Sequence, residues 1–165
     1  MIANRSSRMV LILAAVALAG GCALTAGAEA QTPAKPTAKK SEAGAMHKVA
    51  IQVSDNDKNL MNRALNNTKN LVDFYQARGE TVVVEIVTFH DGLHMLRSES
   101  PVKDRIAVMS LENPNIKFIA CANTQANQSK AEGKPVTLLS EATIMPSGIV
   151  RLIELQKQGY TYIRP

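Results

Sequence analysis

Short apolar runs alternate with amphipathic stretches along most of the chain. Five runs rich in apolar and β-branched residues are typical of strands, and they lie at residues 48–53, 81–89, 116–121, 142–145 and 160–163. Between the first two runs, apolar positions recur at spacings of three and four, at Met61, Ala64, Leu65, Leu71, Val72 and Tyr75, with Thr68 on the same face. This period predicts an amphipathic helix that ends at Gly79.

Two weaker helical patterns follow. One lies around residues 101–111, with Pro101 placed to start it, and the other has Ile149, Leu152, Ile153 and Gln156 on one face and stops at Gly159. Strands that alternate with helices favour a parallel sheet, because parallel strands need crossover connections. We therefore expect residues 46–165 to form a single three-layer α/β/α domain with a mainly parallel five-stranded sheet and flavodoxin-like layering.

The first 30 residues have the pattern of an export signal. A short basic segment precedes the apolar run Met9–Leu18, which is too short for a membrane span of about 20 residues. We favour cleavage after Ala28-Glu29-Ala30, and the alternatives are lipoprotein processing at Cys22 and an uncleaved membrane anchor. The mature protein is expected to be periplasmic or otherwise exported, with no membrane span after cleavage. Residues 31–45, rich in Pro, Ala and Lys, predict a disordered linker.

Composition and charge narrow the class of protein further. Hydrophobic residues make up 45% and charged residues 20% of the chain, which excludes wholesale disorder. The net charge of +5 is concentrated near the N-terminus, since residues 46–165 hold 14 Lys and Arg against 12 Asp and Glu. The basic residues of the domain form no run, so the sequence does not predict a nucleic-acid-binding surface.

Cys121 is the first candidate for chemistry. It ends the third predicted strand and precedes Asn123-Thr124-Gln125-Ala126, a plausible start of a helix. After cleavage at Ala30 it is the sole cysteine, without a disulfide partner in the same chain. A thiol at a helix N-terminus has a lowered pKa and is more reactive. The alternative is a small, buried and inert hydrophobic residue.

Two histidines after the second predicted strand imitate a metalloprotease motif. His90-Asp91-Gly92-Leu93-His94 lacks the Glu base, and Gly92 interrupts the helix that such a motif needs. A solvated loop histidine, a proton partner for Cys121 and an adventitious metal site remain alternatives for His90. We predict no resident metal and no cofactor, because the sequence has no glycine-rich phosphate loop and no C-x-x-C pair. Asp55, Asp57 and Asn59 are interpreted as helix-capping residues rather than calcium ligands.

The domain resembles the DsrE/DsrF-like family of sulfur-relay proteins over about residues 47–165. The segments that carry this resemblance are 47–54, 64–71, Gly92-Leu93, 118–124, 145–150 and 158–165. Exported relatives often have Gly-Pro where this chain has His90-Asp91. The resemblance implies a doubly wound α/β fold, assembly into compact oligomers, and a cysteine at the end of a central strand that carries sulfur as a persulfide. That cysteine matches Cys121.

The sequence therefore predicts an exported DsrE-like protein in which Cys121 binds or relays sulfane sulfur. Asn123 and Thr124 are candidate hydrogen-bond donors beside the thiol, and His90 is a candidate proton exchanger. A sulfur donor or acceptor protein is a possible partner. The alternative is a non-catalytic oligomeric binding module with an inert Cys121. A homo-oligomer is expected in either case, because apolar residues around Met95, Leu96, Val108, Met109 and Leu111 exceed what one small sheet and its helices need.

Overall fold

The structure, a computed structural model, describes residues 44–165. The predicted export signal with both of its cleavage sites, and residues 31–43 of the predicted linker, lie outside the described residues. The first strand of the domain begins at Met46.

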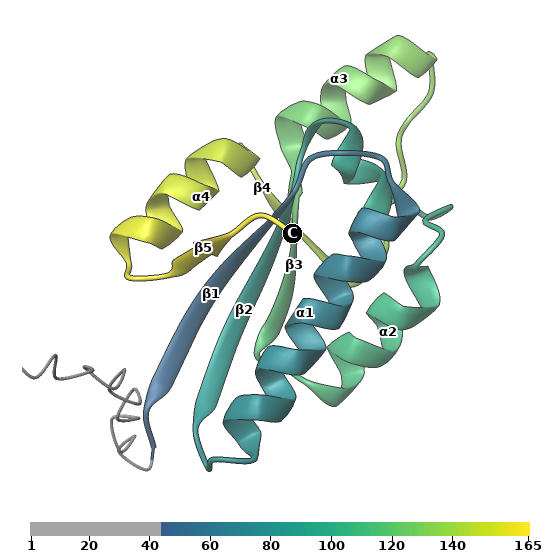
Figure 1. Ribbon diagram of the computed structural model, residues 1–165. Coiled ribbons are helices and arrows are strands. Elements are labelled where there is room, and N and C mark those ends of the chain that lie inside the picture. Colours follow the sequence, from purple (N-terminus) through teal and green to yellow (C-terminus); the bar gives the residue numbers. More distant parts are fainter. Residues whose placement is uncertain (1–43) are drawn as a thin grey trace, which may run out of the picture. The chain divides into compact units, whose positions relative to one another are not determined.

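The five predicted strands form one parallel sheet (Figure 1). They are β1 (Met46–Val53), β2 (Thr81–Thr88), β3 (Ile116–Cys121), β4 (Ala142–Met145) and β5 (Thr161–Ile163), in the spatial order β4-β3-β2-β1-β5. This arrangement confirms the predicted α/β class and the parallel sheet. All five strands end at the same edge, because they run in one direction, and that edge is where an open α/β sheet exposes its ligand-binding groups.

The connections between strands are helical. They are α1 (Lys58–Gln76), the 3₁₀-helix η1 (His90–Leu96), α2 (Lys103–Glu112), α3 (Ala122–Glu132) and α4 (Gly148–Lys157). α1 begins as expected, since the carboxylate of Asp57 accepts the Asn59 N–H at 2.7 Å and the Leu60 N–H at 3.4 Å. α2 begins at Lys103, two residues after the predicted start, and η1 forms where a loop was predicted.

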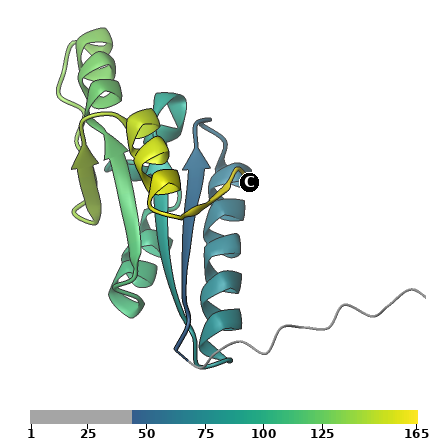
Figure 2. The same ribbon diagram turned by 90° about the vertical axis from the view of Figure 1, so that its left-hand side faces the viewer.

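The helices cover the two faces of the sheet unequally (Figure 2). α1, α2 and η1 lie against one face and enclose the larger hydrophobic cluster, which includes Leu65, Ile86, Leu93, Ile106 and Phe118. α4 packs on the opposite face through Leu152 and Leu155, which contact a smaller cluster formed with Ala50, Val87 and Ile119. α3 buries none of its residues completely. The sheet is thus stabilised mainly from the α1 side, while α3 and α4 flank the edge at which β3 and β4 end.

One ion pair is buried between the sheet and α4. Glu85 on β2 is 1% exposed, and its carboxylate accepts hydrogen bonds from Arg151 Nε at 2.9 Å and Arg151 Nη2 at 2.7 Å. The hydrogen bond to Glu85 raises the pKa of the Arg151 guanidinium above its usual value. A buried carboxylate needs such a partner, so this pair fixes the position of α4 on the sheet.

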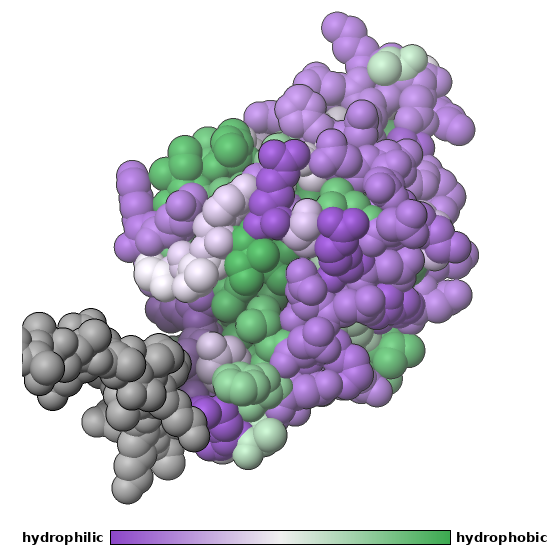
Figure 3. All heavy atoms as spheres, in the orientation of Figure 1, coloured by the Kyte–Doolittle hydropathy of each residue, from purple (hydrophilic) through white to green (hydrophobic). Residues whose placement is uncertain are grey.

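The sequence predicted an exposed apolar surface around residues 95–111, and the structure exposes only part of that segment. Met95 and Leu96 are fully buried, because η1 turns them into the larger cluster, so they offer no partner surface. Val108 and Leu111 are exposed on α2, and Met109 is half-buried against the same cluster. A further group of exposed apolar residues lies on α4, where Ile149, Val150 and Ile153 are 48–55% exposed, and Figure 3 shows this apolar surface over α4. Within residues 44–165 no helix is both long and apolar enough to cross a membrane.

Candidate functional site

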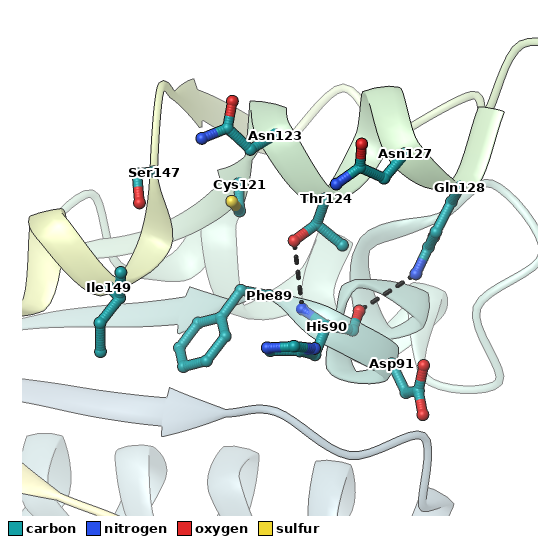
Figure 4. Close-up of a pocket in the computed structure, with 10 residues that line it drawn as sticks. All are labelled: Phe89, His90, Asp91, Cys121, Asn123, Thr124, Asn127, Gln128, Ser147 and Ile149. Carbon is teal, nitrogen blue, oxygen red and sulfur yellow. Dashed lines mark hydrogen bonds between the residues drawn. The ribbon is translucent and has the colours of Figure 1, made fainter. Parts of the chain in front are cut away.

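A pocket opens where β2, β3 and β4 end (Figure 4). Its volume is about 480 Å³. Ten residues line it, and they come from the end of β2 and η1, from β3 with α3, and from the turn into α4: Phe89, His90, Asp91, Cys121, Asn123, Thr124, Asn127, Gln128, Ser147 and Ile149. The four candidate residues of the sequence, Cys121, Asn123, Thr124 and His90, therefore lie around one cavity.

Cys121 is positioned by the transition from β3 to α3. It is the last residue of the strand and the N-cap of the helix, and its backbone is still extended at φ −78° and ψ 114°. The Asn123 N–H donates to Pro146 O at 3.3 Å, which ties the first turn of α3 to the chain after β4. Cys121 is 4% exposed. Cys121 therefore lines the pocket while it is almost entirely buried.

The N-terminus of α4 approaches the same thiol. A Cβ atom at Gly148 would lie 2.9 Å from Phe89 Cδ1 and 3.0 Å from Phe89 Cβ, so only glycine allows α4 to begin so close to the end of β2. Hydrogen bonding by the Gly148 N–H is one of the causes that lower the pKa of the Cys121 thiol. Two helix N-termini, those of α3 and α4, therefore direct backbone N–H groups and positive dipole ends toward one sulfur.

These surroundings change the acidity of the thiol. Burial raises the pKa of Cys121, but the Thr124 hydroxyl and the backbone N–H groups of Gly148, Thr124 and Asn123 donate hydrogen bonds that lower it. The hydrogen bonds outweigh burial, and the pKa of the thiol lies below its ordinary value. At any given pH a larger fraction of Cys121 is therefore thiolate than in an ordinary cysteine, and the thiolate is the nucleophilic form of cysteine.

His90 contributes to the pocket through its main chain. Its N–H donates to Thr124 Oγ1 at 3.2 Å, and its carbonyl accepts from Gln128 Nε2 at 3.1 Å, as the dashed lines of Figure 4 mark. Its imidazole lies beside the Phe89 ring, with ring centroids 5.8 Å apart. The sequence suggested that His90 exchanges a proton with Cys121. Among the hydrogen bonds of residues 44–165, none joins the His90 imidazole directly to the Cys121 thiol.

The lining residues also limit the chemistry of the pocket. Besides Cys121, the titratable groups that line it are His90 and Asp91, and no Lys or Arg is among the ten lining residues. His94 lies outside the lining and has Nδ1 4.0 Å from Glu99 Oε1. Among the described residues, no three His, Cys, Asp or Glu side chains are placed together to hold a metal ion. The lining therefore offers a thiol with hydrogen-bond donors beside it, together with the imidazole of His90 and the carboxyl group of Asp91.

The sequence interpretation missed the contribution of α4. Ser147 and Ile149 line the pocket, and they belong to a segment that follows Cys121 by more than 20 positions. Their signal was the Pro146-Ser147-Gly148 turn directly after an apolar strand, which is a common entry to a helix N-terminus. Asn127 and Gln128 were also missed, and they follow Asn123 and Thr124 by one helical turn.

Comparisons with known proteins support the fold. No family model matches the chain, and no curated protein matches it. Among solved structures, the protein of unknown function MTH1491 from Methanobacterium thermoautotrophicum superposes with a TM-score of 0.62 at 24% sequence identity. The match covers 72% of this chain and 99% of that one. At this identity the likeness shows a common α/β fold.

Proposed function

We propose that the protein is an exported member of the DsrE/DsrF-like family in which Cys121 binds or relays sulfane sulfur as a persulfide. One observation carries the proposal. Two helix N-termini and the Thr124 hydroxyl donate to a single thiol in the lining of a pocket, and they lower its pKa against the effect of burial. The match of Cys121 to the family's sulfur-carrying position agrees with this assignment.

The proposed step is a thiol–persulfide exchange. The Cys121 thiolate attacks the outer sulfur of a donor persulfide, R–S–SH, so that one S–S bond forms and the donor's S–S bond breaks. The donor leaves as the thiolate R–S⁻, and the proton remains on the terminal sulfur of Cys121–S–SH. No electrons are gained or lost overall. The terminal sulfur of a persulfide is anionic when it ionises, and the backbone N–H groups of Thr124 and Gly148 are suited to stabilise that charge.

The pH dependence of thiol alkylation tests the state of Cys121. In a Cys22→Ser background Cys121 is the sole thiol of the chain. We expect native protein to react with iodoacetamide with an apparent pKa below the free-thiol value of about 8.5. A thiol that reacts only after denaturation, or with an apparent pKa above that of a free thiol, would contradict the proposed thiolate.

A second candidate function has its own supporting observation. Cys121 is 4% exposed while α4 exposes Ile149, Val150 and Ile153, a pattern also typical of a binding module with an inert core cysteine. In that case the alkylation experiment gives the denaturation-dependent result, and the protein still associates through its apolar surface. The two candidate functions therefore predict different reactivities for the Cys121 thiol, whereas both predict that the protein associates through its apolar surface.

The proposal includes a homo-oligomer that shields the thiol. Ile149 lines the Cys121 pocket and is 55% exposed, so a second copy on the α4 face would cover apolar surface and the mouth of the pocket together. We expect light scattering of the exported form to give a multiple of the chain mass at micromolar concentration. Ile153→Glu on α4 should lower that mass, and Leu111→Glu on α2 is the matched control.

A monomer at that concentration would contradict the assembly. An oligomer that disappears with reductant would contradict the shielding, because it would be held by a disulfide between two exposed thiols.

A further inference from the structure

His90 has an unusual backbone conformation. Its φ is 51°, and it is the one residue other than glycine with a positive φ among residues 44–165. Left-handed backbone is unfavourable for a residue with a Cβ, and it persists where neighbouring contacts hold it. Both main-chain polar groups of His90 are held here, the N–H by Thr124 Oγ1 at 3.2 Å and the carbonyl by Gln128 Nε2 at 3.1 Å.

The two partners of His90 belong to one polar row on α3. Thr124, Gln128 and Glu132 are spaced by four residues and lie on the same side of the helix. Glu132 accepts from Arg97 Nη1 at 2.6 Å and from Arg97 Nη2 at 3.0 Å, and Gln128 Oε1 accepts from Arg97 Nη1 at 3.3 Å. Because α3 buries none of its residues completely, these hydrogen bonds are a large part of what fixes it against the segment from His90 to Arg97.

The hydrogen bond from His90 determines what the Thr124 hydroxyl can do. A hydroxyl has one hydrogen to donate, and its oxygen accepts through lone pairs. Because the oxygen accepts the His90 N–H, a hydroxyl rotamer with its hydrogen directed away from His90 is favoured. Cys121 and Thr124 line the same pocket, and hydrogen bonding to the Thr124 side chain lowers the pKa of the Cys121 thiol. Figure 4 shows Thr124 between the Cys121 sulfur and the His90 main chain.

We propose that His90 is a positioning residue for Cys121, and that it acts through its left-handed main chain, whose N–H orients the Thr124 hydroxyl toward the sulfur. The imidazole takes no part in this relay. The inference rests on the proposed function, because it explains how the thiol of that site is kept ready to react. It also replaces the role of proton exchanger that the sequence suggested for His90.

Four single substitutions in the full-length Cys22→Ser chain test the relay, with the alkylation rate against pH as the readout. His90→Gly keeps the left-handed conformation without strain and removes the imidazole, so its rate at neutral pH should stay within about twofold of the parent. His90→Val disfavours that conformation. Thr124→Val removes the hydroxyl, and Thr124→Ser keeps it. We expect both valine variants to react about three- to tenfold more slowly at neutral pH, with the apparent pKa raised, and Thr124→Ser to react like the parent.

His94→Val is the matched control, since it places the same residue in η1 outside the lining of the pocket. A His90→Gly protein as slow as Thr124→Val would overturn the relay, because it would assign the effect to the imidazole. Thr124→Val at the parent rate would overturn it as well. If His90→Val does not fold, the comparison of Thr124→Val with Thr124→Ser and His90→Gly still decides whether the Thr124 hydroxyl or the His90 imidazole controls the alkylation rate. A parent protein that alkylates as expected yet takes up no sulfur from polysulfide would refute the proposed function and leave the relay standing.

Discussion

Replacing Arg151 with methionine should lower the free energy of unfolding by about 3–5 kcal/mol. The side chain of Glu85 is 2% exposed and lies on β2 beneath α4, where Arg151 donates two hydrogen bonds to its carboxylate. Methionine fills a similar volume without a charge, so the substitution leaves a buried carboxylate without its counter-ion. The cost is the desolvation of that carboxylate, which the pair otherwise compensates.

Chemical denaturation of the parent and the Arg151→Met variant measures this loss. Arg164→Met is the matched control, because Arg164 Nη2 lies 3.6 Å from Asp55 Oδ2 with both side chains more than half exposed. A surface pair of this kind contributes at most about 1 kcal/mol. If Arg151→Met loses no more stability than Arg164→Met, the buried pair does not anchor α4.

The same substitution links stability to the candidate site. α4 supplies the Gly148 N–H that reaches Cys121, and Arg151 is one helical turn further along the same helix. Loosening of α4 should therefore raise the pKa of the thiol and slow its alkylation, even in the fraction of molecules that remain folded.

Most of the fold could be predicted from the period of apolar residues. The strand at 116–121 and the strand at 142–145 have the predicted bounds, and the N-cap of α1 is Asp57, one of the residues interpreted as helix-capping. These elements were predictable because burial in a layered sheet imposes a period of two or a continuous apolar run, while a helix imposes a period of 3.6. The spatial order of the strands is set by tertiary contacts that no local pattern encodes.

The pattern of apolar residues was misleading where the chain forms a 3₁₀-helix, η1. Met95 and Leu96 follow Gly92 in a segment predicted as a loop, so they were assigned to the surface. In the structure η1 packs against the end of β1, and a Cβ at Gly92 would lie 2.3 Å from Val53 O. That close approach turns both side chains into the core. Short 3₁₀-helices have no extended period from which they can be predicted.

The thiol of the candidate site and its neighbours in sequence were predictable, but their interactions were not. Cys121 and Thr124 were identified because strand ends and helix starts can be located in sequence, and parallel strands bring those ends to one edge. The role of the His90 main chain depends on a φ angle, and glycine is the residue that usually signals such an angle. A buried ion pair of Glu85 could have been predicted from the sequence, because a carboxylate inside the apolar run 81–89 needs a buried partner.

Substitution of Cys121 should abolish sulfur uptake, which is the largest functional effect expected for any single change in the chain. The other groups of the pocket can only hold or orient the sulfur, whereas Cys121 forms the new S–S bond. The hydroxyl of serine ionises far less readily than a thiol and forms no persulfide, so Cys121→Ser keeps the size of the side chain while it removes the chemistry.

Intact-mass analysis after incubation with inorganic polysulfide tests the central claim most directly. The two proteins to compare are the Cys22→Ser chain and the same chain with Cys121→Ser. The account predicts that the first gains the mass of one or more sulfur atoms, that dithiothreitol removes the added mass, and that the second gains nothing. An equal gain in both proteins, or no gain in the protein that retains Cys121, would contradict the assignment of Cys121 as a sulfur carrier.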